Sequence, residues 1–523
     1  QMMRRNDQKR EYDIVFGEED FMKIGWLQII MAVIYMGILI GVGLYMSRKV
    51  KSSDDFWIGG RQVGPVATAL SYGAAYVSTV AIIGDPPMYY NYGLGYAAFE
   101  IMISVFFCCI LIFIVFAPKM RALSERLNVV SLSGFLAIRY KSNRFRLLCG
   151  TLVSVMMVPY AISAMKGIAD AMHAIVGIPY AMGVVVIAVV SFCYLVTAGY
   201  WGVSTTDIIQ GITIAVSCLL VAVIVITKSG GVTEAVTYMG SVSPSHIQPS
   251  SGLTFAQLFS WAGVWALIAF GQPQLVTKFM GLRDSRTVGT VIRVAVVWEI
   301  IFMVSIAMIG AAAFKLFGAV PFDNVDAIVP TLVAEHTNAV VSGIFLCGIL
   351  AAGLSTTVAL VLTSSGAVTK DIYEDYYCAR SNAKQDSGKS VRISRFATGI
   401  ILVVVVIGSI YPPDFIWSLS TMSAGVMGAA FTAPLVLGLY WKRATRQGCM
   451  AGIIGGSAVS IIWYFAGLTS VVHSFVPGTA VSFLLMVLVS LCTPRMEEEH
   501  LDVFFEPGCS KNKIQAAIAA GSK

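Results

Sequence analysis

The sequence has few charged side chains: Asp, Glu, Lys and Arg make up 12% of its 523 residues. Soluble domains carry about 25% charged residues, so this scarcity argues against a soluble protein. Hydrophobic residues account for 57% of the chain, and apolar runs of about 20 residues, the length that crosses a bilayer, recur along most of it. Because helices satisfy their own backbone groups in lipid, the composition predicts an all-α integral membrane protein with about 13 transmembrane helices.

Signatures of several enzyme and metalloprotein classes are also absent. The ten cysteines show no Cys-x-x-Cys spacing and the five histidines show no metal-ligand spacing, so the sequence predicts neither a redox pair nor a zinc centre. It contains no Walker A string, which argues against direct use of ATP. We therefore expect no catalytic residues, and the chain is predicted not to be an enzyme.

The net charge of +7 is better explained by membrane topology than by nucleic-acid binding. Lys and Arg cluster in alternate loops, and by the positive-inside rule such loops face the cytoplasm. The basic loops lie at 48–51, 119–146, 278–293, 370–395 and 442–446. An odd number of spans then places the N-terminus outside, although Arg4-Arg5 and Lys9-Arg10 disagree with that placement. The expected location is the plasma (inner) membrane, as a multi-pass protein in contact with lipid.

Two of the predicted spans are interrupted by residues that weaken a helix. The stretch 71–87 carries Gly, Pro, small and hydroxylated residues, and Phe270-Gly-Gln-Pro273 interrupts a span in the other half. Loosened backbone persists in a membrane only where it is buried in protein or lines a cavity. One interruption in each half is typical of the central site of a secondary transporter.

We divide the chain into three parts. Residues 1–64 would hold an extracellular N-terminus, the first transmembrane helix and a cytoplasmic loop. Residues 65–440 would form the transporter core, and residues 441–523 two trailing helices and a cytoplasmic tail. The core holds two groups of about five spans, which predicts a 5+5 inverted repeat with broken helices, since an odd number of spans reverses the orientation of the second group. Residues 371–392 are expected to be a polar internal linker.

Six strings together resemble the sodium/solute symporter family. They lie at 54–61, 70–75, 202–207, 270–273, 350–356 with 371–373, and 428–443. Within the family, the chain is most similar to bacterial sodium/proline and sodium/pantothenate permeases. The resemblance implies a sodium-coupled importer of a small-molecule solute that works by alternating access.

A candidate sodium site lies on two of these strings. Sodium is a hard cation that prefers oxygen ligands. Ser355 and Thr356 place two hydroxyl groups at one level of a helix, and the carbonyl of Ala352 falls on the same side. The loosened segment can add the carbonyls of Ala74 and Val77. The resemblance implies that these five residues bind sodium; from the residues alone, a Ser-Thr pair that only bonds to helix carbonyls remains an alternative.

Some family members carry a second sodium site, which needs hydroxyl groups three and four positions after the serine, together with an aspartate. This chain has Val358 and Ala359 at those positions, and its Asp207 lacks the hydroxyl partners. We therefore expect one sodium ion per transport cycle.

Five residues are candidates for contact with the solute. Trp265, Gln272 and Pro273 lie on the span that lines the substrate cavity in proline permeases, and Tyr76 and Ser78 lie in the first interruption. A lipid-interface tryptophan and a structural kink are the alternatives for Trp265 and Pro273. Proline permeases carry an aspartate in place of Tyr76, which favours a small organic acid, either a monocarboxylate or pantothenate-like. A proline-type amino acid and a transporter-like sensor are the alternatives.

Ionisable residues in or near spans are costly and usually face protein or water. They include Asp85, Glu100, Lys166, Asp170, Asp207 and Glu299. Lys166 and Asp170 are four positions apart and are expected to neutralise each other. Asp85 precedes Pro86-Pro87 and is expected near the outer mouth, either in a turn or in a functional role.

Overall fold

The computed structural model describes residues 25–48, 61–319, 322, 324–378, 387–412, 415–506 and 509–521. Within these residues the chain is helical and has no strand, apart from one isolated bridge between Val63 and Leu282. Ten of the described helices are long and apolar enough to cross a membrane. The predicted all-α membrane class is therefore confirmed. The count of thirteen stays a prediction, because it also includes interrupted helices and divides one long helix in two.

The long helices are interleaved with short helices that cap the ends of the bundle. The long ones are α2 (Trp26–Ser47), α9 (Arg144–Val176), α10 (Tyr180–Lys228), α15 (Val288–Phe317), α17 (Ala339–Gly366), α19 (Ser387–Ile410), α20 (Ile416–Tyr440), α21 (Arg446–Phe465) and α22 (Phe475–Cys492). The short ones include α7 (Ala117–Leu127), α8 (Leu132–Arg139), α11 (Val232–Val242), α16 (Ile328–His336), α23 (Glu498–Phe505) and α24 (Lys511–Gly521).

The helices at the centre of the bundle differ in composition from those around it. Most of α17 and α20 is buried, and both helices are rich in Gly, Ala, Ser and Thr, which allow close helix packing in a membrane. By contrast, α2, α19 and α22 expose many large apolar side chains, as expected for helices that face lipid. The core that holds the site is therefore built on small residues.

Two helices are broken near the middle of the molecule. Helix α4 (Pro65–Tyr76) ends at Val77, whose backbone is extended (φ −82°, ψ 117°), and the chain resumes as the π-helical η2 (Val80–Gly84) and α5 (Asp85–Ser104). In the other half, α12 (Phe255–Ala262), α13 (Val264–Ile268) and η5 (Ala269–Gly271) lead to an extended Gln272 (φ −85°, ψ 112°) and then to α14 (Pro273–Gly281). Both interruptions expected from the sequence are present.

The break in the first half is narrower than the sequence suggested. It lies at Val77, whereas Pro86 and Pro87 lie inside helical structure, at the start of α5. Proline is tolerated there because the first turn of a helix does not need its N–H groups. Asp85 begins α5 and does not lie in a turn, and its side chain is buried, 3% exposed; its position relative to the outer mouth stays a prediction.

The predicted internal linker is also partly helical. Helix α17 continues without a gap as the π-helical η8 (Ala367–Cys378). Asp371 is buried there, where its carboxylate accepts hydrogen bonds from Ser131 (2.7 Å) and Ser133. These bonds explain why a polar segment stays ordered and packed against α8. The remainder of the expected linker includes residues 379–386, which lie outside the described residues.

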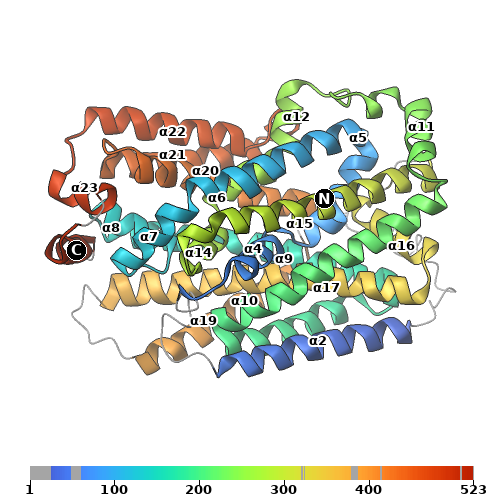
Figure 1. Ribbon diagram of the computed structural model, residues 1–523, viewed down its shortest axis with the longest axis horizontal. Coiled ribbons are helices and arrows are strands. Elements are labelled where there is room, and N and C mark those ends of the chain that lie inside the picture. Colours follow the sequence, from blue (N-terminus) through green and yellow to red (C-terminus); the bar gives the residue numbers. More distant parts are fainter. Residues whose placement is uncertain are drawn as a thin grey trace, which may run out of the picture.

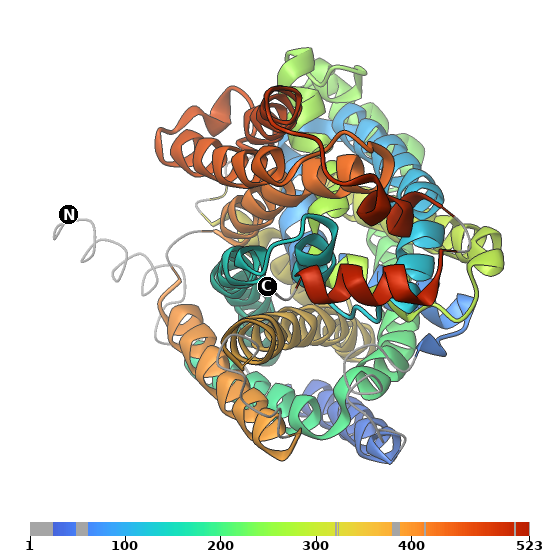
Figure 2. The ribbon, with the colours of Figure 1, turned by 90° about the vertical axis from the view of Figure 1, so that its left-hand side faces the viewer.

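The two ends of the bundle differ in charge. Figure 1 shows α7, α8, α14 and α23 gathered at one end and α11 and α16 at the other. The first end carries the basic residues 119–146 and 278–293, so the positive-inside rule predicts that it faces the cytoplasm. Figure 2 looks onto that end, where the C-terminal helices lie across the bundle, and α24 contacts α7 and α8. The basic segment at 49–51 and the N-terminal residues 1–24 lie outside the described residues.

Candidate functional site

The five residues predicted to bind sodium come together where α17 passes the break in α4. The Ser355 hydroxyl lies 2.8 Å from the carbonyl oxygen of Ala74 and 3.0 Å from that of Ala352. The Thr356 hydroxyl lies 3.5 Å from the carbonyl oxygen of Val77. Both hydroxyl groups are buried. The five predicted ligands therefore lie on two neighbouring stretches of helix, and their hydroxyl and carbonyl oxygens are neutral groups of the kind that a monovalent hard cation prefers.

The break in α4 makes its carbonyl oxygens available. In a continuous helix each carbonyl accepts a bond from the N–H four residues later. The extended backbone of Val77 ends this pattern, so the last turn of α4 has carbonyl groups that need other partners. The hydroxyl groups on α17 lie at the level where these carbonyls point.

Three of the five candidate solute residues line one small cavity between the two broken helices. Tyr76, Ser78 and Trp265 lie on its wall. The cavity is small, with about 20 Å³ free, the space of roughly one water molecule. Gln272 lines an adjoining cavity that shares Tyr76 and Trp265 with the first.

Gln272 and Pro273 are placed differently from the other three. The Gln272 amide donates to the carbonyl oxygen of Ala424 on α20 (3.1 Å), and its side-chain oxygen accepts from Gln274 (3.0 Å). Pro273 lines a separate cavity towards the cytoplasmic end, which Lys278 and Asp371 also line. Both residues shape the break in the second helix, but the structure does not bring Pro273 into the cavity lined by Tyr76 and Trp265.

Two acidic residues line the same central cavity and were not among the sequence candidates for solute contact. They are Asp85 and Glu100, and each is 3% exposed. A third carboxylate, that of Glu299 on α15, lies close by and accepts a 2.6 Å hydrogen bond from Ser104, which is itself 3.3 Å from the Tyr76 hydroxyl. The available signal was the presence of acidic residues in apolar spans, since such residues face protein or water.

Asp207 is paired with Lys278, which the charge pattern of the sequence places in a basic loop. Lys278 lies inside α14 and is buried. Its ammonium group is 2.8 Å from the Asp207 carboxylate and 2.7 Å from the Ser71 hydroxyl, which in turn donates to Asp207 (2.6 Å). The group joins α4, α10 and α14, and so links both broken helices. A positive charge thus stands beside Asp207, where a second sodium site would need a free carboxylate.

A second buried ion-pair group lies towards the opposite end. Lys166 on α9 is 2.7 Å from Asp170, so the predicted pairing of these two residues is present. Lys166 is also 2.8 Å from Asp326 in η7 (Val325–Ala327), and Asp326 accepts a bond from the backbone N–H of Ile416 at the start of α20 (3.3 Å). The group therefore joins α9, α20 and the segment before α16.

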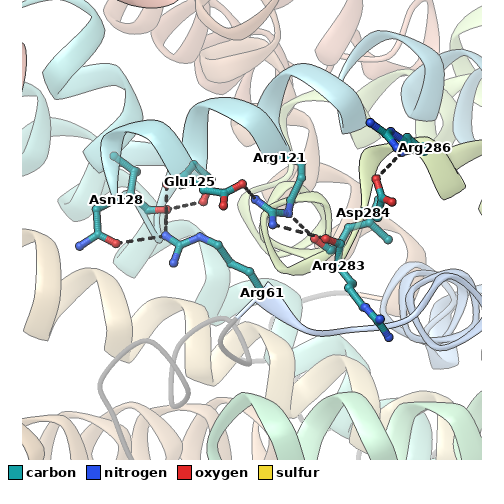
Figure 3. Close-up of polar contacts among 10 residues, drawn as sticks. Arg61, Arg121, Glu125, Asn128, Arg283, Asp284 and Arg286 are labelled. Carbon is teal, nitrogen blue, oxygen red and sulfur yellow. Dashed lines mark hydrogen bonds and ion pairs between the residues drawn. The ribbon is translucent and has the colours of Figure 1, made fainter. Parts of the chain in front are cut away.

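The ends of both broken helices that lie near α7 are joined to each other by polar contacts (Figure 3). The backbone of Val63, just before α4, bonds to Gly281 (3.2 Å) and Arg283 (2.9 Å), just after α14. Arg121 on α7 donates to the carbonyl oxygens of Leu282 and Arg283, and pairs with Glu125 (2.7 Å). Arg61 donates to the backbone of Ser124 (3.1 Å) and to the side chain of Asn128 (3.3 Å). The inner halves of the two broken helices therefore meet as one unit.

Comparison with known proteins agrees with this architecture. The chain is 28% identical over 473 residues to the osmoregulated proline transporter OpuE of Bacillus subtilis, a match that covers 88% of this chain and 94% of the relative. It is 27% identical over 468 residues to the high-affinity proline transporter PutP of the same species, covering 88% and 98%. It is 27% identical over 491 residues to the sodium/proline symporter of Staphylococcus aureus, covering 90% and 93%.

Among solved structures, a Na⁺-coupled sialic acid symporter matches with a TM-score of 0.77 at 18% identity, over 90% of this chain and 98% of that one. Mhp1, a nucleobase-cation-symport-1 family transporter, matches with a TM-score of 0.55 at 13% identity, over 86% and 97%. These likenesses concern the fold alone.

A model of the sodium:solute symporter family matches residues 56–456. The motif at 54–60 lies outside the described residues, whereas the other motifs lie within them. The relatives and the ten candidate spans agree with the predicted multi-pass plasma-membrane location. Because the family model covers more than half of the chain, the chain belongs to the sodium:solute symporter family.

Proposed function

We propose that this protein imports a small amino acid of the proline type together with one sodium ion, by alternating access. The observation that carries the proposal is the set of five oxygen atoms from Ala74, Val77, Ala352, Ser355 and Thr356 at the break in α4. Sodium bound there would join α4 to α17. Because the same break lines the central cavity, sodium and solute would stabilise one arrangement of the two helices and bind with positive coupling.

The choice of an amino acid over an organic acid reverses the preference drawn from Tyr76. The relatives that match most of this chain are proline transporters, and their similarity extends over far more residues than the single position 76. In our proposal Tyr76, Ser78 and Trp265 contact the solute, while Gln272 and Pro273 shape the second break.

The proposal of one sodium ion per solute rests on the surroundings of Asp207. Val358 and Ala359 provide no hydroxyl groups, and the Asp207 carboxylate is already bound by the Lys278 ammonium group. The lysine would supply a fixed positive charge in place of a second ion. We further propose that residues 65–440 form the core that carries this cycle, with residues 1–64 and 441–523 as the flanking parts.

Uptake into proteoliposomes tests the proposed function. Labelled proline, a panel of other small amino acids, and labelled monocarboxylates and pantothenate would each be offered with an inward sodium gradient, and again with potassium replacing sodium. We expect accumulation of proline or a close analogue only with the sodium gradient. Accumulation of a carboxylate in preference to every amino acid would contradict the choice of solute, and uptake that ignores sodium would contradict the coupling.

A further inference from the structure

We propose that Asp85 and Glu100 bind a positively charged nitrogen of the solute in the central cavity. The inference rests on the proposed function and adds to it the chemical class of the solute: an amine or a quaternary ammonium compound, zwitterionic or cationic, and not an organic anion. It follows from the placement of the two acidic side chains, their lack of partners, and the other residues on the wall.

A bend in the chain brings the two carboxylates to one cavity. Helix α5 is interrupted at Gly93, whose φ angle is positive (φ 80°, ψ −169°). A side chain at this position would overlap His246, so glycine is required here. Asp85 lies before the bend and Glu100 after it, and both line the cavity between the broken helices.

Neither carboxylate is fully satisfied by the protein. Asp85 Oδ1 and Glu100 Oε2 are buried and have no hydrogen-bond partner among the described residues. An acidic group in such a place is costly unless a cation or a donor accompanies it. The side chain of Trp265 lies near Asp85 and that of Tyr89 near Glu100, but neither residue carries a positive charge.

Three other buried carboxylates of the bundle have a basic partner, whereas Glu299, close to the cavity, is bonded by the Ser104 hydroxyl and has no basic partner among the described residues. Asp207 is paired with Lys278, and both Asp170 and Asp326 are paired with Lys166. The protein therefore supplies a cation to these acidic groups. It supplies none to the two that line the cavity, which is the arrangement expected if the cation arrives with the solute.

The remaining wall of the cavity also suits a cation. Tyr76, Tyr160, Trp265 and Phe302 present aromatic rings there, and the described residues that line it include no Lys, Arg or His. The ring centroids of Tyr160 and Trp265 are 5.9 Å apart. Aromatic faces attract ammonium groups, and more strongly when water is excluded. An anionic solute would meet two carboxylates and no positive side chain.

The cavity is also next to the proposed sodium site, whose five oxygens, those of Ala74, Val77, Ala352, Ser355 and Thr356, are called the sodium cage below. Val77 lies on the cavity wall, and its carbonyl oxygen belongs to the cage. With about 20 Å³ free, the cavity must widen to admit a solute, and the broken helices are the elements that can move apart. An ammonium group at Asp85 and a sodium ion at Val77 would then both hold the first broken helix.

Pairs of probes that differ in the charged nitrogen test this inference. Binding of L-proline and of tetrahydrofuran-2-carboxylate, its nitrogen-free analogue, would be measured by calorimetry on the purified full-length protein in sodium chloride. Choline and its uncharged analogue 3,3-dimethylbutan-1-ol form the second pair. We expect the nitrogen-bearing member of at least one pair to bind at least ten-fold more tightly. Asp85→Asn and Glu100→Gln should each weaken that binding about ten-fold. Asp85→Glu keeps the carboxylate and should reduce the binding affinity less than Asp85→Asn does.

The control is Glu234→Gln, which removes a carboxylate from a salt bridge with Lys315 at an exposed loop helix and should leave binding unchanged. Stabilisation of each variant by sodium against heat shows that it is folded and that the cage is intact. Equal binding of the nitrogen-free analogues, full affinity in both neutral variants, or no binding of either amine would overturn the inference. If sodium does not stabilise the unaltered protein against heat, that result would instead contradict the proposed function.

Discussion

At the scale of single residues, the proposed sodium site depends on two hydroxyl groups that lie near carbonyl oxygens. Replacing Ser355 or Thr356 by alanine removes one oxygen ligand, worth about 1–2 kcal/mol. Apparent sodium affinity in solute uptake should therefore fall roughly ten-fold in each variant. Thr356→Ser keeps the hydroxyl group and is the matched control. Unchanged sodium dependence in both alanine variants would remove these residues from the mechanism.

Mutations of residues that contact the solute should change the solute KM and leave the sodium affinity nearly unchanged. Tyr76 and Trp265 lie on the wall of the central cavity and outside the set of sodium oxygens. Tyr76→Phe and Trp265→Phe should therefore raise the KM for the solute several-fold while the sodium affinity changes less. Uptake measured at saturating sodium, and then at saturating solute, distinguishes the two effects. If solute KM stays at its original value in both variants and only protein yield falls, these side chains serve packing.

The Lys278–Asp207 pair should show strong coupling in a double-mutant cycle. Removing only one partner of a buried ion pair leaves an unpaired charge and costs about 3–5 kcal/mol. Lys278→Met and Asp207→Asn should therefore each lower the midpoint of thermal unfolding clearly. The double variant should be more stable than the sum of the two losses predicts. Losses that simply add would mean that the two residues do not act as a pair.

The residues of the site differ in how far they could be predicted from sequence. Ser355, Thr356 and Ala352 lie within one turn of helix, so their spacing alone places their oxygens together. The pairing of Asp207 with Lys278 spans 71 residues, and no local pattern indicates it. The charge pattern alone therefore places Lys278 in a basic loop, whereas it lies within α14. The same limit applies to Asp85 and Glu100, which share a cavity because the chain bends at Gly93.

At the scale of elements, the two helix breaks are the structural feature that the sequence predicts best. Gly271 and Pro273 flank the extended Gln272, and both residue types weaken a helix, so the second break is local. The first break was placed less well, because Pro86-Pro87 is as strong a helix-breaking signal as any residue near Val77. Their place at the start of α5 removes the conflict, and only the packed structure shows it.

The C-terminal helix α23 should detach as the pH falls. His500 is buried between α8 and α23, where its Nε2 donates to the Arg139 carbonyl oxygen (3.2 Å). Burial, together with the positive charges of Lys141 and Arg139, lowers its pKa from 6.5 to about 4. As the pH falls, His500 therefore takes up a proton more readily when α23 is detached than when it is packed against α8. The packing of α23 is fully stable above about pH 7 and weakens between pH 6.5 and 4. At pH 5 the loss is up to about 2 kcal/mol.

Hydrogen exchange of α23 at pH 7.5 and pH 5 measures this effect. Protection should fall at pH 5 in the unaltered protein, and the pH dependence should flatten in His500→Asn, which cannot take up a proton. Equal pH dependence in the two proteins would show that another group controls the docking.

At the scale of the whole molecule, polar contacts join the inner halves of the two broken helices to each other. The inner halves of both broken helices are joined by Val63 and Arg283, and Lys278 joins them again nearer the centre. Sodium in the cage would connect this unit to α17. Opening the cavity to the other side of the membrane would then change the contact between α4 and α17. Because the proposed sodium site lies at that contact, sodium binding and the conformational change would be coupled.

The central claim, that one sodium ion bound in this cage drives one solute, is tested most directly by the coupling ratio. The reversal potential of solute transport would be measured in proteoliposomes under imposed sodium and solute gradients. The account predicts one sodium ion per solute and a sodium dependence with a Hill coefficient of about one, as for a single site. A ratio of two would show that a second site exists despite the Lys278–Asp207 pair, and transport indifferent to the sodium gradient would contradict the account.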